Sequence, residues 1–322
     1  MARQKLTGLK PQSYEHPGDA AALNALQNTA GLDTVVRKLN SWGFERLLRV
    51  QLTGSYLKTT PDSFPDLHAA LQEACEVLYS PIVPDLYIAP GPINALTAGT
   101  ERPLIILNSM AIDLLTADEL FFVLAHEVGH IKSAHVLYYQ IAQYLPFIAE
   151  ILGSATFGLG DLLSVGLQAA LLRFQRQAEH TADRAGLLAC QDAEVAIRVL
   201  MKLAGLPTKS YGTMNTEDFI TQAREFQALD ADTLSLVAKW LSTVGSTHPW
   251  TVVRAQELLK WIDSGEYDQL LKNPERRTVK LPTGVLAFCG GCGAPLRGME
   301  TFCPRCGKPA PPIPGLVKGA GR

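Results

Sequence analysis

The sequence predicts a mainly helical α+β domain followed by a small module of different composition. Apolar residues recur at helical spacing through most of the first 272 residues, two short apolar runs are typical of strands, and proline, glycine and cysteine dominate beyond Asn273. With 322 residues, 47% of them hydrophobic, and a net charge of −2, the chain can bury a sizeable core. Global disorder is therefore excluded, and no general surface for polyanions is expected.

Residues 1–30 are predicted to be a polar lead-in to this domain. They contain two prolines and lack the apolar core of a secretory signal, so a cytoplasmic location is expected. Strands are predicted at Leu86–Ala89 and Leu104–Leu107, on either side of a turn-rich stretch. Helical patterns cover 32–48, 66–79, 116–130, 174–190, 192–205, 216–228, 232–243 and 249–263.

The run His126-Glu127-Val128-Gly129-His130 is the most informative motif in the chain. On a helix, positions i and i+4 share a face, so both imidazoles can bind one metal ion at about 2.0–2.1 Å. Glu127 points away from that plane and is placed to take a proton from a water molecule that the metal activates. The alternative is a chance pair of hydrogen-bonded core histidines, but the flanking residues are almost wholly apolar, where such groups are costly without a metal.

A catalytic zinc ion needs a third protein ligand, and the later run Glu179-His180-Thr181-Ala182-Asp183 offers two. Glu179 and Asp183 share a helix face, so either one could bind the metal while the other accepts the ring N–H of a ligand histidine. His180 points elsewhere. The alternative is a solvated helix face on which arginines at 173, 176 and 184 pair with the acidic residues.

These motifs resemble those of the gluzincin metallopeptidases, which include HtpX and the CAAX prenyl proteases. The resemblance rests on HEVGH at 126–130, on EHTAD at 179–183 with Arg176 before it, on NALTAG at 94–99 and on STHP at 246–249. It implies a zincin-like metallopeptidase domain with a small sheet. The implied zinc ligands are His126, His130 and Glu179, the general base is Glu127, and Asp183 and Arg176 support the ligands. The implied substrate-binding strand includes Asn94, Ala95, Leu96 and Thr97.

His248 has two interpretations. The resemblance implies that it stabilises the oxyanion of the tetrahedral intermediate. Alternatively, Ser246-Thr247 could form the N-cap of the helix that follows, with His248-Pro249 at its start.

Members of the resembled family such as HtpX carry transmembrane spans, some of them between the HExxH motif and the later glutamate. This chain differs from them in that region. Its apolar region, 136–172, is divided by charged residues into runs that are shorter than the about 20 residues needed to cross a bilayer. We therefore expect an apolar helical hairpin inserted over the HEVGH helix, and a peripheral contact with a membrane surface remains open.

The C-terminal module has the spacing of a zinc ribbon. Two CxxC pairs, Cys289 with Cys292 and Cys303 with Cys306, would close a four-thiolate structural zinc site. A protein partner is expected through this module and no nucleic acid. The predicted organisation is a metallopeptidase domain at 31–272, a linker at 273–284, the ribbon at 285–310 and a disordered tail at 311–322.

The sequence thus predicts a zinc-dependent metalloendopeptidase with one catalytic and one structural Zn²⁺, acting on a peptide or protein substrate. Two alternatives stay open. One is an inactive adaptor that kept the metallopeptidase fold and binds partners through its ribbon. The other is a non-proteolytic metal hydrolase, in which a cysteine would be expected in place of the acidic third ligand.

Overall fold

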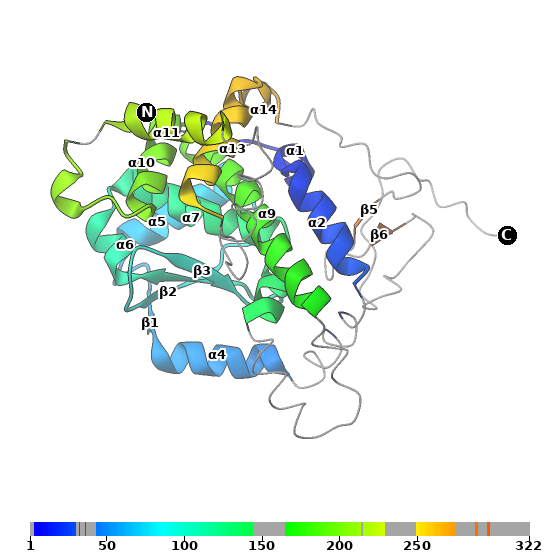
Figure 1. Ribbon diagram of the computed structural model, residues 1–322. Coiled ribbons are helices and arrows are strands. Elements are labelled where there is room, and N and C mark those ends of the chain that lie inside the picture. Colours follow the sequence, from blue (N-terminus) through cyan, green and yellow to red (C-terminus); the bar gives the residue numbers. More distant parts are fainter. Residues whose placement is uncertain are drawn as a thin grey trace. The chain divides into compact units, whose positions relative to one another are not determined.

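The computed structural model describes residues 3–29, 32, 36, 43–143, 165–213, 215–228, 249–274, 287–288 and 295–296. Its internal contacts divide the chain into two units, Met1–Arg277 and Thr278–Arg322. The first unit holds the helices and a small sheet (Figure 1).

The sheet has four strands in the order β1-β2-β4-β3. β1 (Leu57–Lys58) pairs antiparallel with β2 (Asp85–Ala89), which runs parallel to β4 (Leu104–Asn108). β3 (Ala95–Ala98) pairs antiparallel with β4 and forms an edge of the sheet. The two predicted strands are confirmed as β2 and β4, and the segment expected from the resemblance to be an edge strand is β3.

Alternate residues of the strands bury opposite faces of the sheet. Leu86, Ile105 and Leu107 belong to the main core cluster, which α5 (Pro65–Val77) and α7 (Ala117–Lys132) complete. Tyr87 and Ile106 on the other face pack with Leu52 of α4 (Phe44–Ser55). In Figure 1, α4 accordingly lies on one side of the sheet, with α5 and α7 on the other.

Helices α9 (Val165–Cys190) and α10 (Ala193–Leu203) pack against α7, and further helices pack on these two. The long helix α9 contacts α7 most extensively, and α10, α11 (Thr216–Ala228) and α13 (Thr251–Asp263) share a further apolar cluster. The helical predictions at 66–79, 116–130, 174–190, 192–205, 216–228 and 249–263 are confirmed, although α9 starts nine residues earlier than predicted. Shorter elements are α6 (Ser109–Leu114), the 3-10 turn η2 (Thr208–Ser210) and α14 (Glu266–Lys272).

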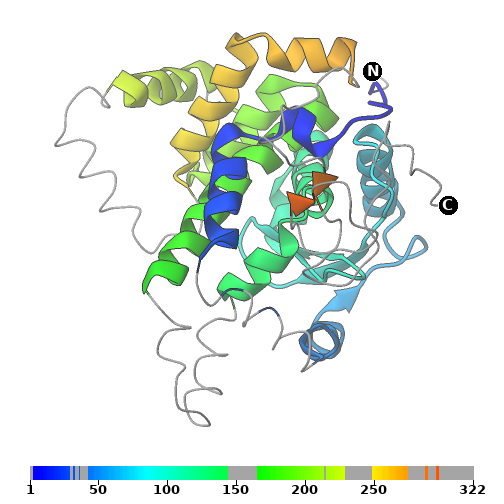
Figure 2. The same cartoon turned by 90° about the vertical axis from the view of Figure 1, so that its right-hand side faces the viewer.

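The segment expected to be a polar lead-in packs onto the domain. It contains α1 (Pro11–Tyr14) and α2 (Pro17–Gln27), and α2 lies alongside α9 (Figure 2). Tyr14 belongs to the main core cluster, while Leu26 packs with Phe174 of α9. The apolar residues of this segment are few, but the large ones at Leu6, Leu9, Tyr14 and Leu26 are fully or almost fully buried.

Several predictions lie wholly or partly outside the described residues. The helix predicted at 232–243 is not described, and of the helix predicted at 32–48 only 32, 36 and 43–48 are described, with 44–48 in α4. Residues 136–143 are helical, but 144–164, the middle of the predicted hairpin, are not described. In the second unit, β5 (Ala287–Phe288) pairs antiparallel with β6 (Pro295–Leu296), whereas Cys289, Cys292, Cys303, Cys306 and the tail are not described. No helix in the described ranges is long and apolar enough to span a membrane.

Candidate metal centre

Helix α7 carries HEVGH and begins with a capping box. The hydroxyl of Thr116 accepts a hydrogen bond from the backbone N–H of Glu119, and the Glu119 carboxylate accepts one from the backbone N–H of Thr116 at 2.8 Å. The Glu119 carboxylate also binds Lys202 of α10 at 2.6 Å. The start of α7 is thus fixed, and the two histidines fall one turn apart on its buried face.

Glycines allow α7 and α9 to approach closely. A Cβ atom on Gly129 would lie 2.6 Å from the Cβ of Ala185, and one on Gly186 would lie 2.7 Å from the ring of Phe122. Distances this short require that a helix or, at Gly186, the ring of Phe122 shifts. The glycine within HEVGH therefore serves packing, since it brings Glu179 of α9 up to the two histidines of α7.

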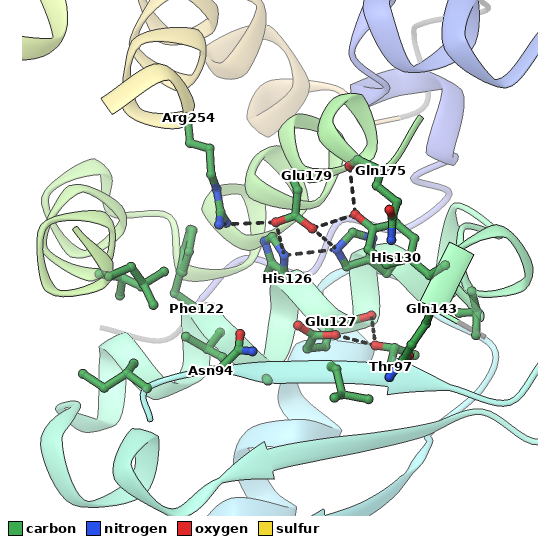
Figure 3. A pocket seen from close by; sticks show the side chains of 18 of the residues that line it. Asn94, Thr97, Phe122, His126, Glu127, His130, Gln143, Gln175, Glu179 and Arg254 are labelled. Carbon is green, nitrogen blue, oxygen red and sulfur yellow. Dashed lines mark hydrogen bonds and ion pairs between the residues drawn. The ribbon is translucent and has the colours of Figure 1, made fainter. Parts of the chain in front are cut away.

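The three predicted ligands converge. Nε2 of His126 lies 3.1 Å from Nε2 of His130, and the Glu179 carboxylate lies 3.6 Å from the first and 3.5 Å from the second. In a tetrahedral zinc site with bonds of about 2.0–2.1 Å, the ligand atoms are separated by about 3.3 Å. The donor set, two imidazoles and one carboxylate that are all buried, fits such an ion and leaves one position open. Figure 3 shows the three side chains facing one another.

The groups around these ligands hold them in place. Nδ1 of His126 donates to Oδ1 of Asp183 at 3.1 Å, which leaves its Nε2 free to face the centre. Arg254 of α13 binds Asp183 through two hydrogen bonds of 2.8 and 2.6 Å and lies 3.3 Å from Oε2 of Glu179. Burial alone would raise the pKa of Asp183, but Arg254 and His126 together outweigh it and hold this pKa at about 2. Tyr139 donates to Oε1 of Glu179 at 2.6 Å.

Glu127 points away from the ligands toward the sheet. The hydroxyl of Thr97, on the edge strand β3, donates to its Oε2 at 2.5 Å. Burial raises the pKa of Glu127, while neighbouring His126 and the Thr97 hydrogen bond oppose this rise. The carboxylate is thus positioned as a proton acceptor whose pKa lies above that of an exposed glutamate.

A cavity of about 330 Å³ opens between β3, α7 and α9. Its walls include the three metal-site side chains, Glu127 and Arg254, together with the β3 segment Asn94, Ala95, Leu96 and Thr97 (Figure 3). The substrate-binding segment expected from the resemblance therefore lines the same cavity as the candidate metal site.

Comparison with known proteins identifies the family. Residues 61–262 match the family model described as Peptidase family M48. The chain belongs to peptidase family M48. It is also 34% identical over 274 residues to the plastoglobule-localized metallopeptidase 48, chloroplastic, of Arabidopsis thaliana, a match that covers 84% of this chain and 78% of that protein. No solved structure matches the chain.

Two alternatives drawn from the sequence of this M48 peptidase are wrong. Glu179 and Asp183 are 2% and 1% exposed, so they do not lie on a solvated helix face, and Arg184 instead binds backbone carbonyls of α1 and its C-cap. Helix α13 starts at Thr251 and its N-cap residue is Trp250, so the alternative that placed Ser246-Thr247 at the N-cap is wrong; those two residues themselves lie outside the described residues. His248 itself lies outside the described residues, and its catalytic role stays a prediction.

Sequence reasoning missed several residues of the M48 centre. The arginine that contacts Asp183 is Arg254, whereas Arg176, which was expected to support the ligands, lies half-buried on α9 and keeps that role only as a prediction. Tyr139, His135 and Asp19 were also missed. A third histidine five residues after HEVGH was a visible signal, but the other three depend on contacts between distant segments.

Proposed function

We propose that the protein is a zinc-dependent metalloendopeptidase. The observation that carries this proposal is the convergence of two imidazoles and a carboxylate on one point of a cavity, with a second glutamate, Glu127, buried beside them. Membership of peptidase family M48 supports it. His126, His130 and Glu179 would hold the catalytic zinc ion, which supplies a Lewis acid that polarises a peptide carbonyl and lowers the pKa of water.

Glu127 would act as the general base. It takes a proton from the attacking water and passes that proton to the nitrogen of the departing amine. Thr97 holds its carboxylate by the 2.5 Å hydrogen bond, so one oxygen remains available for the water. His248 is proposed to donate a hydrogen bond to the oxyanion that forms.

An extended peptide would bind along β3. The strand pairs with β4 on one side, and its residues Ala95, Leu96 and Thr97, with the preceding Asn94, line the cavity. Addition of a substrate strand to this edge would supply backbone hydrogen bonds that do not depend on side-chain identity. The carbonyl to be cleaved could thereby be aligned between Glu127 and the metal site.

The C-terminal module is proposed to be a zinc ribbon that binds one structural Zn²⁺ and contacts a protein partner. Cys289 and Cys292 lie in the sequence between the paired strands β5 and β6, as the first CxxC of a ribbon would. Location in the cytoplasm with a peripheral membrane contact also remains a proposal. The name of the Arabidopsis relative, which describes that protein as plastoglobule-localized, supports the contact.

Peptide hydrolysis with and without a chelator tests the proposed activity. The purified chain should cleave members of a peptide library, and 1,10-phenanthroline should abolish cleavage until zinc is restored. Glu127→Gln should abolish cleavage and keep the zinc, because Glu127 is not a ligand. Glu179→Ala should instead release the catalytic zinc. An active Glu127→Gln variant would contradict the role assigned to Glu127, and an inactive wild-type chain that holds both zinc ions would favour the adaptor.

A further inference from the structure

The two histidines of the metal site are held in different ways. His126 donates directly to the carboxylate of Asp183. Nδ1 of His130 lies instead 3.0 Å from Nδ1 of a third histidine, His135. Nε2 of His135 in turn lies 3.0 Å from Oδ2 of Asp19 on α2, and the hydroxyl of Thr181 donates to that same oxygen at 2.6 Å. His130 thus reaches a carboxylate through an interposed imidazole.

This chain of contacts determines where the protons lie. A carboxylate only accepts, so Nε2 of His135 must carry a hydrogen. The Nδ1 of neutral His135 is then an acceptor, which requires that Nδ1 of His130 carries a hydrogen too. Nε2 of His130 is left with its lone pair directed at Glu179 and His126, which is the tautomer that a metal ligand needs.

The contacts of His135 are buried, and they include the negative charge of the Asp19 carboxylate, which is not required to pack α2 against α9. His135 is 2% exposed, and Asp19 is fully buried. Within the described ranges, Oδ1 of Asp19 has no hydrogen-bond partner, and an unpaired carboxylate oxygen without water is costly. The negative charge is favourable, however, if a cation binds at the far end of the two imidazoles.

The carboxylate comes from outside the segment that the family model matches. Asp19 lies on α2, and the match begins at residue 61. Helix α2 therefore supplies the last member of a chain of contacts whose other end is the HEVGH motif.

We propose that Asp19 and His135 are positioning residues for His130, and that α2 is thereby a functional part of the metal centre. They fix the tautomer and the ring orientation of His130 and so raise the affinity of the site for zinc. This inference rests on the proposed zinc site, and its test separates the two.

The test measures zinc affinity in the full-length protein. Asp19→Asn removes the charge of the side chain and keeps its shape. His135→Phe keeps a ring against Phe174 and removes the imidazole that connects His130 to Asp19. Both should weaken zinc binding at the catalytic site by about 10- to 100-fold, measured by competition with a chromophoric chelator. Gln27→Leu is the matched control. Gln27 also lies on α2 and donates to Tyr138 at 3.2 Å, and neither of these side chains belongs to the contacts that join Asp19, His135 and His130, so loss of this hydrogen bond should leave the affinity unchanged.

Replacement of zinc by Co²⁺ shows which of the two proposed zinc sites a variant alters. Thiolate ligands give Co²⁺ intense charge-transfer bands that a site of two histidines and a glutamate lacks. In the Asp19→Asn variant the weaker bands of the nitrogen and oxygen site should change, and any thiolate bands should not. If Asp19→Asn does not fold, His135→Phe carries the same measurements.

Unfolding temperatures separate positioning from a purely structural role. If Asp19 positions His130, the rise in unfolding temperature that zinc causes should be smaller in Asp19→Asn than in the wild type, whatever the variant does to the metal-free protein. An equal loss of stability with and without zinc, at unchanged zinc affinity, would overturn the inference. If wild type and Glu179→Ala bind the same amount of zinc, the proposed metal site itself is wrong.

Discussion

Thr97 on the edge strand donates a hydrogen bond of 2.5 Å to the carboxylate of Glu127 in the middle of α7. This contact joins the strand proposed to bind substrate to the glutamate proposed to act as base. Because Thr97 holds one carboxylate oxygen, the orientation of the other depends on the position of β3. A peptide that pairs with β3 would therefore be aligned with the same residue that aligns the base.

Thr97→Val should slow hydrolysis without loss of metal. The variant keeps the shape of the side chain and removes the donor but leaves the base itself, so we expect kcat to fall about 10- to 100-fold, less than the about 10²–10⁴-fold that general acid–base catalysis contributes as a whole. The hydrogen bond favours the charged form of Glu127, and its removal should raise the pKa of Glu127 further. The acidic limb of the pH–rate profile should then move to higher pH.

Thr100→Val is the matched control for that experiment. Its hydroxyl also donates to a glutamate, Glu45, at 2.6 Å, but this pair is exposed and away from the cavity. Zinc content should be unchanged in both variants. An unaltered pH–rate profile in Thr97→Val would show that the contact does not orient the base.

Arg254→Met should destabilise the protein through Asp183. The guanidinium makes two hydrogen bonds to that carboxylate, and both groups are buried. Removal of one partner of a buried ion pair leaves the other charge uncompensated, and we expect a loss of about 3–5 kcal/mol in the free energy of unfolding by urea. The double variant Arg254→Met with Asp183→Asn should recover part of the loss. Equal stability of Arg254→Met and wild type would contradict this account.

The parts of the centre that the sequence predicted are those set by local periodicity. His126 and His130 lie one turn apart on α7, as do Glu179 and Asp183 on α9, so each pair could be placed on one helix face without knowledge of the fold. The role of Glu127 followed from the motif. The edge strand was predicted from the resemblance, because residues 95–98 carry no strong strand pattern of their own.

The parts that were missed depend on contacts between distant segments. Arg254 lies 71 residues from Asp183, on a helix where a single arginine is typical of a solvated surface. Asp19 lies in a segment with few apolar residues, whose helix becomes buried only when it packs beside α9. No local pattern distinguishes a buried charge from an exposed one, because its partner lies elsewhere in the sequence.

The Glu15 carboxylate predicts a pH dependence of stability near the N-terminus. Burial and the nearby charge of Asp19 raise the pKa of Glu15 from 4.5 to about 7. An acid whose pKa is higher in the folded protein than in the unfolded chain lowers stability once the pH exceeds its pKa in the unfolded chain, and the full cost is present above pH 7.

Glu15→Gln should therefore raise the free energy of unfolding more at pH 8 than at pH 5. The difference between the two gains should be on the order of 2 kcal/mol. Urea unfolding at the two pH values measures this difference. The exposed Glu217→Gln variant should change little at either pH, and a gain for Glu15→Gln that is equal at both would contradict the assignment.

Truncation after Pro282 should remove one zinc ion and leave the first unit folded. Internal contacts separate Met1–Arg277 from Thr278–Arg322, and each residue of the candidate catalytic centre described here lies in the first unit. A ribbon too small for its own core would derive most of its folding energy from the metal, so its removal should not affect the other unit. We expect about two zinc ions in the full chain and about one in the truncated chain, measured by metal analysis of the purified proteins.

Cys303→Ser in the full chain is the control. This variant should lose the same zinc ion while the chain keeps its full length. Two zinc ions in the truncated protein would contradict the ribbon assignment, and loss of the helical circular dichroism signal would show that the second unit supports the fold of the first.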